Sequence, residues 1–121
     1  MLPRRHRLTR SRDFTRARRF GRSASSPLVA LYVLPVRSPD ARVGFSVSKK
    51  VGKATVRNRV KRRMREAVRH QLPRIRPGQD LVFIARPAAA EATYHELAVV
   101  IDSLLRKRGA IVVPAERARN A

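Results

Sequence analysis

The residues that could carry out acid–base or metal chemistry are few and scattered. The chain has 8 Asp and Glu residues, 3 His and no Cys. A hydrolytic site needs such groups to converge, for example as carboxylates that hold two metal ions. No carboxylates have the local spacing of such a site, although distant residues could still converge in the fold. Glu96 is better explained as a helix cap and Asp13 as a partner of a helix dipole. We therefore expect no catalytic residue and no protein metal site.

Cationic side chains dominate the composition and gather in two segments. The 29 Lys and Arg residues against 8 acids give a formal net charge of +21. Residues 1–22 contain nine Arg and one acid, and residues 49–70 contain ten Lys and Arg and one acid. Such a charge repels itself in the folded state, and binding to phosphates neutralises it while releasing counterions. Composition therefore predicts a nucleic-acid-binding protein.

The second cationic segment has the spacing of an amphipathic helix. Thr55 could cap it, and it would run to about Leu72, before Pro73. One arc of this helix is apolar and consists of Val56, Val60, Met64, Ala67, Val68 and Leu72. The other positions are mostly Arg and Lys, and Glu66 alone cannot pair with so many cations. We expect the apolar arc to pack on a sheet and the cations to contact nucleic acid, because Arg suits phosphate geometry.

Three apolar or alternating runs predict the strands of that sheet. Residues 28–36 are nearly all apolar, residues 42–48 alternate, and residues 80–86 are again apolar. Turn-forming residues at 37–40 separate the first two runs and predict a β-hairpin between them. Residues 22–27 are either a loop or a short edge strand.

Two further helices are predicted from their end signals. Ser11 could cap a short helix that ends near Phe20, before Gly21. Thr93 and Glu96 form the Thr-x-x-Glu capping box of a helix that ends at Gly109. The resulting order, α-β-β-β-α-β-α, predicts an α/β sandwich (α+β) with a sheet of about four strands.

The domain organisation is expected to be simple. A chain of 121 residues, 43% of them hydrophobic, suits one domain with its own core. We expect a flexible basic arm at residues 1–10, a single RNA-binding domain at 11–109 and a C-terminal tail at 110–121. No apolar run approaches the roughly 18 residues that span a bilayer, and no signal-peptide pattern is present. A cytoplasmic location and no membrane partner are therefore expected.

Two aromatic residues could contact an unpaired base. Phe14 lies on the short basic helix. It either packs in the core, as most Phe side chains do, or offers its ring to an unpaired nucleotide base. Stacking on single strands contributes roughly 1–3 kcal/mol per base. Tyr32 lies in the middle of a strand and is either buried or exposed at a cleft.

Four short segments, taken in order, carry a resemblance to a known family. They are Arg7-Leu8 with Asp13-Phe14, Leu31-Tyr32, the run from Arg42 to Gly52 (RVGFSVSKKVG), and Arg57-Asn58-Arg59 with the basic residues that follow it. The strand at 80–86 and the capped helix also fit, so the similarity covers roughly residues 5–108. The sequence resembles the bacterial ribonuclease P protein, and the Ser-Lys-Lys-x-Gly loop together with Arg-Asn-Arg is highly specific.

The resemblance implies a role in tRNA maturation. In this family a large RNA is the catalyst, it holds Mg²⁺, and the protein assists removal of the 5′ leader from precursor tRNA without another protein partner. The chain would then be a subunit of an endoribonuclease with no catalytic residue of its own. The implied catalytic-RNA-binding residues are Arg57, Asn58, Arg59, Lys61, Arg62 and Arg65. The implied leader-binding residues are Phe14, Arg18, Tyr32, Lys49 and Lys50.

The family also sets two expectations about geometry. A left-handed βαβ crossover is implied, although about 98% of such crossovers are right-handed, together with a fold similar to ribosomal protein S5 domain 2-like folds. A second aromatic commonly follows four residues after the position of Phe14, but here that position is Arg18, with Phe20 two residues later. Arg18 can stack on a base through its guanidinium plane, so either residue could take that role.

Two rival functions are compatible with the composition. The first is a ribosomal or other accessory RNA-binding protein without a role in cleavage. The second is a self-sufficient metal-dependent nuclease, which the scattered acids disfavour.

Overall fold

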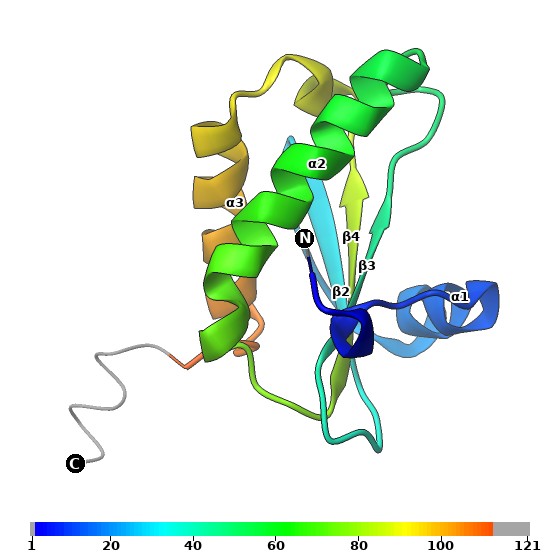
Figure 1. Ribbon diagram of the computed structural model, residues 1–121, viewed down its shortest axis with the longest axis vertical. Coiled ribbons are helices and arrows are strands. Elements are labelled where there is room, and N and C mark those ends of the chain that lie inside the picture. The colour runs from blue at the N-terminus through cyan, green and yellow to red at the C-terminus, as the bar shows by residue number, and fades with distance from the viewer. Residues whose placement is uncertain (1, 113–121) are drawn as a thin grey trace.

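The chain forms a four-stranded mixed sheet with helices on both faces. The computed structural model describes residues 2–112. Their elements are η1 (Arg4–His6), α1 (Ser11–Phe20), β1 (Arg22–Ser25), β2 (Val29–Pro35), β3 (Arg42–Ser46), α2 (Ala54–Gln71), η2 (Leu72–Arg74), β4 (Gln79–Ala85), η3 (Pro87–Glu91) and α3 (Tyr94–Lys107). α2 and α3 lie on one side of the sheet and α1 on the other (Figure 1). The predicted element order and four-stranded sheet are confirmed.

The strand order differs from the one that local sequence suggested. The sheet runs β1-β2-β4-β3, with β2 antiparallel to β1 and β4, and β3 parallel to β4. The predicted hairpin between residues 28–36 and 42–48 is therefore wrong, because Phe83 of β4 lies between Leu31 of β2 and Phe45 of β3. Residues 22–25 are the short edge strand. The β3–α2–β4 crossover is present, while its left-handed sense and the likeness to ribosomal protein S5 stay predictions.

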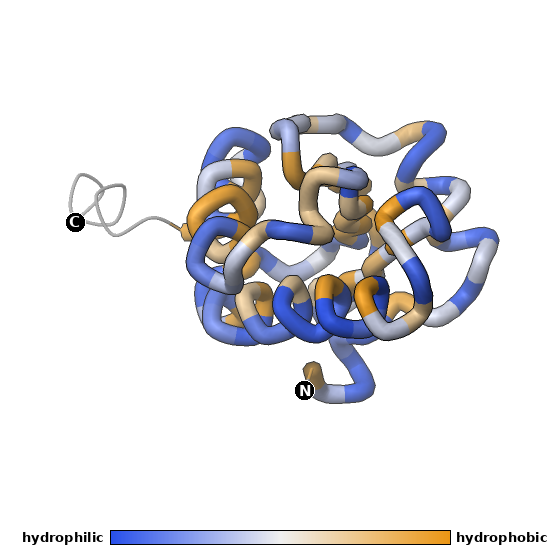
Figure 2. The backbone as a smooth tube through the Cα atoms, turned by 90° about the horizontal axis from the view of Figure 1, so that it is seen from above, coloured by the Kyte–Doolittle hydropathy of each residue, from blue (hydrophilic) through white to orange (hydrophobic). Residues whose placement is uncertain are grey.

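The main core lies between the sheet and the α2–α3 layer. The predicted stripe of α2 is buried at Val60, Met64, Ala67 and Val68, and Val56 and Leu72 pack against it partly buried. The buried residues of α3 repeat at helical spacing and are Leu97, Ile101, Leu104 and Leu105. Figure 2 shows the same pattern from above, with apolar stretches inside and hydrophilic stretches outside. Burial of these two stripes fixes the orientation of α2.

A smaller core lies beneath α1 on the opposite face of the sheet. It is made by Leu8, Ala17 and Val82, with Phe14 and Tyr32 packed against it partly buried. Because this cluster is small, α1 needs additional contacts to hold its position on the sheet.

Both expected domain boundaries move outward. Leu2 and Leu8 are only 2% and 6% exposed, and the Leu8 N–H donates to the Val43 carbonyl at 2.9 Å. Residues 2–8 therefore lie against the domain, because their two leucines bury apolar surface, and they do not project as a free arm. At the other end Ala110 and Ile111 are buried and Ile111 bridges to Ile75, so the domain continues past residue 109. The rest of the expected tail, from residue 113, lies outside the described residues.

Only one of the three predicted N-caps is formed. Ser11 is the first residue of α1, whose N-cap position is Arg10, and Thr55 lies inside α2, whose N-cap position is Lys53. Neither N-cap residue makes a side-chain cap bond. For α3, the Glu96 N–H donates to Thr93 Oγ1 at 3.1 Å and the Thr93 N–H donates to Glu96 Oε1 at 3.0 Å. That backbone bond lowers the pKa of Glu96 below its ordinary value. The capping box is confirmed, whereas α1 and α2 begin without one.

Candidate nucleic-acid interface

The exposed side of α2 presents cations that lack protein partners. The side chains of five of the six residues expected to bind the catalytic RNA make no hydrogen bond or ion pair within residues 2–112. We call these five the α2 surface: Arg57, Asn58, Lys61, Arg62 and Arg65. Cations held on a helix without acidic partners keep their donors free for phosphate oxygens.

Two arginines of α2 have a structural role that sequence reasoning missed. The guanidinium of Arg59 donates to the Ala90 carbonyl at 3.2 Å, and that of Arg63 donates to the Ala92 carbonyl at 2.6 Å. These bonds tie α2 to η3 and to the residues just before α3. Arg59, expected to bind RNA, is therefore partly committed to the fold. Backbone carbonyls have no sequence signature, so no signal in the sequence could have found these contacts.

A shallow cleft of about 360 Å³ lies between α1 and the sheet. It is lined by Phe14, Thr15, Arg18, Arg19 and Tyr32, which we call the α1 cleft. Three of the five residues expected to bind the leader are thus brought together. From sequence, Phe14 and Tyr32 are each expected either in the core or at a cleft. Both are half-buried, and each packs against the small core and also lines the cleft.

The remaining candidates for the leader lie elsewhere. Lys49 and Lys50 are exposed in the turn after β3 and do not line the α1 cleft. Phe20 also lies outside the lining and is 66% exposed, with the Arg19 guanidinium 5.4 Å from its ring centroid. Of the two residues weighed for the place of a second aromatic, Arg18 lines the α1 cleft and Phe20 does not.

An ion network with two buried carboxylates joins α1 to the sheet. Arg42 of β3 donates to both carboxylate oxygens of Asp80 at 2.8 Å and lies 3.7 Å from a carboxylate oxygen of Asp13. Asp80 and Asp13 are only 2% and 7% exposed. The hydrogen bonds to Asp80 raise the pKa of Arg42 above its ordinary value. The network joins α1, β3 and β4, and no local sequence pattern predicts it.

Phe14 sits so close to β3 that its position requires a glycine. A Cβ atom built on Gly44 would lie 2.4 Å from Phe14 Cζ and 2.6 Å from its Cε1. Any larger residue at position 44 would push the ring away from the strand. Gly44 is thus a second residue that positions the cleft, and it lies within the run that carried the family resemblance.

Two of the other acids, Glu66 and Asp102, form ion pairs within their own helices. Glu66 binds Arg69 with a shortest contact of 2.5 Å, which lowers the pKa of Glu66, and Asp102 binds Arg106 at 2.8 Å.

Among residues 2–112 there is no group of three or more His, Cys, Asp or Glu side chains placed to hold a metal ion. Within the same residues no helix is both long and apolar enough to cross a bilayer. The described residues thus define a class: a small basic α/β protein with an unpaired cationic surface and an aromatic cleft, the features of a nucleic-acid binder.

The chain belongs to the ribonuclease P protein family. The family model described as Ribonuclease P matches residues 2–109. A relative from Roseiflexus castenholzii, named ribonuclease P protein component, is 42% identical over 111 residues, covering 91% of this chain and 91% of the relative. A relative of the same name from Chloroflexus aurantiacus is 45% identical over 115 residues, covering 94% and 84%. The family suggested by the four sequence segments is confirmed.

Solved structures agree with this assignment. The Staphylococcus aureus RNase P protein superposes with a TM-score of 0.82 at 28% identity, covering 88% of this chain and 98% of that one. The Thermotoga maritima RNase P protein, solved with 1-(4-fluorophenyl)-2-thiourea, gives a TM-score of 0.75 at 30% identity, covering 83% and 98%. A further S. aureus structure is described as a mutant with defective mRNA degradation activity.

Proposed function

We propose that this chain is the protein subunit of ribonuclease P and assists endonucleolytic removal of the 5′ leader from precursor tRNA. The α2 surface would bind the catalytic RNA, and the α1 cleft would bind the single-stranded leader. The proposal includes a cytoplasmic location and no required protein partner.

The observation that carries the proposal is that two helices on opposite faces of one sheet, α2 and α1, carry two different surfaces (Figure 1). The α2 surface offers unpaired cations, which suit the phosphates of a folded RNA. The α1 cleft offers Phe14, Tyr32 and Arg18, whose rings and guanidinium plane suit stacking on unpaired bases. One protein could therefore hold the catalytic RNA and the leader at the same time.

The proposal assigns the chemistry to the RNA subunit. Mg²⁺ would be bound by that RNA and by the substrate, where it can activate water and stabilise the leaving oxygen. The contribution of the protein would be to position the leader and to neutralise phosphates. Lys49 and Lys50 would take part as exposed cations near the end of β3 and not as cleft residues.

Reconstitution with the cognate catalytic RNA tests the proposal. At low Mg²⁺ the added protein should increase precursor-tRNA cleavage or affinity, because it supplies charge that Mg²⁺ otherwise provides. If the protein binds the RNA but changes neither quantity, the accessory RNA-binding alternative replaces our assignment.

A reaction without the RNA subunit tests the third possibility, that the protein is a nuclease by itself. The S. aureus RNase P protein mutant is described as defective in mRNA degradation activity, so a nuclease activity needs its own control. Cleavage by the purified chain that survives removal of all RNA subunit would support a nuclease activity of the protein itself. We expect no precursor cleavage under these conditions.

A further inference from the structure

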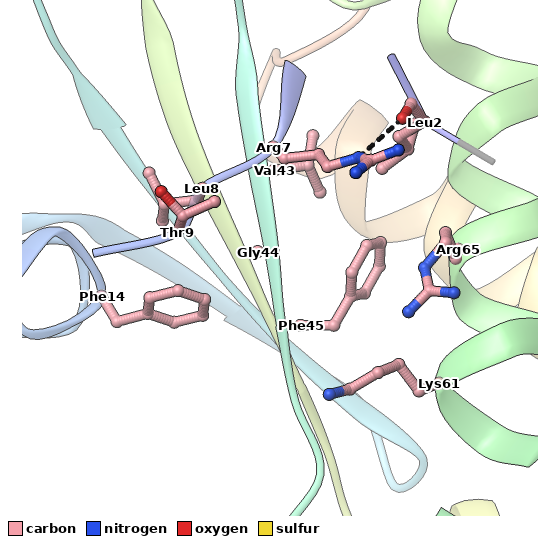
Figure 3. Close-up of a pocket in the computed structure, with 10 residues that line it drawn as sticks. All are labelled: Leu2, Arg7, Leu8, Thr9, Phe14, Val43, Gly44, Phe45, Lys61 and Arg65. Carbon is pink, nitrogen blue, oxygen red and sulfur yellow. Dashed lines mark hydrogen bonds between the residues drawn. The ribbon is translucent and has the colours of Figure 1, made fainter. Parts of the chain in front are cut away.

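A pocket of about 280 Å³ lies at the outer edge of β3, between the N-terminal segment, α1 and α2. In Figure 3, Phe14 and Leu8 approach β3 from one side, while Phe45, Lys61 and Arg65 lie on the other. We call this site the β3-edge pocket. Pockets for small molecules hold about 300–1,000 Å³, so this one has room for a single base and not for a longer ligand.

The cations of this pocket have no protein partner. Lys61 and Arg65 come from successive turns of α2, and within residues 2–112 neither side chain makes a hydrogen bond or an ion pair. Both are partly shielded from water, which strengthens their attraction for an anion. Arg7 also lines the pocket, but its Nε donates to the Leu2 carbonyl at 2.8 Å. Lys61 and Arg65 therefore supply the charge that a phosphate would meet.

An aromatic ring provides the apolar side of the pocket. Phe45 is half-buried, and its ring stacks on Phe83 with centroids 5.8 Å apart and planes 18° apart. That stack holds the Phe45 ring in place where it lines the pocket. A preordered ring loses little side-chain entropy when a base packs against it.

The backbone edge of β3 adds hydrogen-bonding groups. The N-terminal segment pairs with β3 only at Val43, and no other described strand covers this edge. Because peptide groups alternate in direction along a strand, those of Phe45 point outward like those of Val43. An unpaired N–H and C=O at a sheet edge can pair with an incoming partner, here the hydrogen-bonding edge of a base.

We propose that the β3-edge pocket binds one unpaired nucleotide of the catalytic RNA, with its base at Phe45 and its phosphate at Lys61 and Arg65. This inference rests on the proposed function. It assigns the nucleotide to the catalytic RNA because both cations belong to the α2 surface, whereas the α1 cleft has its own residues. Phe14 lines both sites, so the two sites adjoin at this ring. Aromatic stacking with hydrogen bonds to base edges is the common way in which proteins read unpaired RNA.

Hydrogen exchange at the Phe45 amide tests the pocket directly. In the free full-length chain this unpaired amide should exchange rapidly, and in the complex with catalytic RNA alone it should slow at least tenfold. If the complex forms but exchange at Phe45 is unchanged, the pocket is not used and the inference is wrong. Slowing that requires a precursor with a leader would overturn the assignment to the catalytic RNA. Failure to form any complex would instead contradict the proposed function.

Two arginines on the same helix provide a matched comparison. Arg65 lines the pocket, and Arg62 is exposed on α2 outside it. At saturating RNA, Arg65→Ala should remove most of the protection of the Phe45 amide, while Arg62→Ala should weaken affinity but leave that protection intact. Equal loss of protection in both variants would contradict a specific pocket.

A change to the ring gives a second readout. Phe45→Leu keeps an apolar side chain in the core but removes the stacking face, so we expect about a tenfold loss of affinity for the catalytic RNA. Its thermal unfolding is measured in parallel, because Phe45 also stacks on Phe83. If a folded Phe45→Leu variant binds the RNA as tightly as the native chain, the base is not held at Phe45.

Discussion

The α2 surface and the α1 cleft arise from the two most basic segments of the chain, yet they use charge differently. The side-chain cations of the α2 surface lack protein partners, and the helix is held by its apolar stripe and by the bonds of Arg59 and Arg63 to carbonyls. Where α1 meets β3 and β4, two of the few acids of the chain are buried in an ion network. The α2 surface, which must stay cationic, thus contains no acid, whereas the acids Asp13 and Asp80 help to hold α1 on the sheet.

This difference separates two modes of RNA binding. Binding at the α2 surface should depend on the number of phosphates neutralised, and so on salt. Binding at the α1 cleft should depend on where α1 places Phe14 and Arg18, and so on the buried contacts beneath the helix. Variants that shift α1 should therefore weaken binding at the α1 cleft, and variants that remove unpaired charge should weaken binding at the α2 surface.

The largest effect is expected when the buried network is broken. Arg42→Ala leaves the carboxylates of Asp13 and Asp80 buried without their cation. Removing one partner of a buried pair costs about 3–5 kcal/mol, and because the side chain of Arg42 is 34% exposed we expect a loss of about 2–3 kcal/mol in the free energy of unfolding. Urea denaturation measures it, and a loss below about 1 kcal/mol would show that the network does not hold α1.

Two other variants control for charge alone. Arg42→Lys keeps the positive charge but cannot donate to both oxygens of Asp80, so an intermediate loss is expected. Arg22 is exposed on β1, and Arg22→Ala should change stability by no more than about 0.5 kcal/mol.

The next effect concerns the position of Phe14. In Gly44→Ala the new methyl group displaces the ring, and we expect weaker binding of precursors with long leaders by about 1–3 kcal/mol. The measurement is holoenzyme affinity for long-leader precursor relative to mature tRNA. Adding Phe14→Ala to Gly44→Ala should cause little further loss, because both act through the same ring. Full additivity of the two losses would contradict this account.

The smallest effect is expected at the α3 capping box, which belongs to neither the α2 surface nor the α1 cleft and so serves as a control. Thr93→Ala removes one cap bond of α3 and should lower stability by about 1 kcal/mol without changing RNA discrimination. Glu96 has a lowered folded-state pKa, so its charge stabilises the fold above about pH 4.5, the ordinary value, and this contribution is lost as pH falls through the folded value. The destabilisation in Glu96→Gln, measured by denaturation, should accordingly vanish in acid.

The elements could be predicted from sequence, because each strand and helix has its own local signal. Alternation marked residues 42–48, and the stripe from Val56 to Leu72 marked α2 together with its buried face. Their pairing could not be predicted in this way. A short turn at 37–40 favours a hairpin locally, but β3 pairs with β4 across the α2 crossover, and that contact is non-local.

The candidate site was predictable to a similar degree. Residue type and spacing brought out the α2 cations and Phe14, and the structure places Phe14, Arg18 and Tyr32 at one cleft. The positioning contacts of Arg42 and Gly44 depend on three elements meeting in space, so they have no local signature. Similarly, two leucines among arginines gave no sign that residues 2–8 pack on β3.

The separation of the two surfaces is tested most directly by a matched pair of exposed arginines, Arg62 on α2 and Arg18 at the cleft. Affinity for the catalytic RNA and preference for a long leader would be measured for both Ala variants across a salt series. Arg62→Ala should weaken RNA affinity about tenfold, lower the salt slope by about 0.7–0.9 and leave leader preference intact. Arg18→Ala should reduce leader preference and leave RNA affinity intact. If both variants change both quantities in the same proportion, the chain has one undivided RNA surface and the account is wrong.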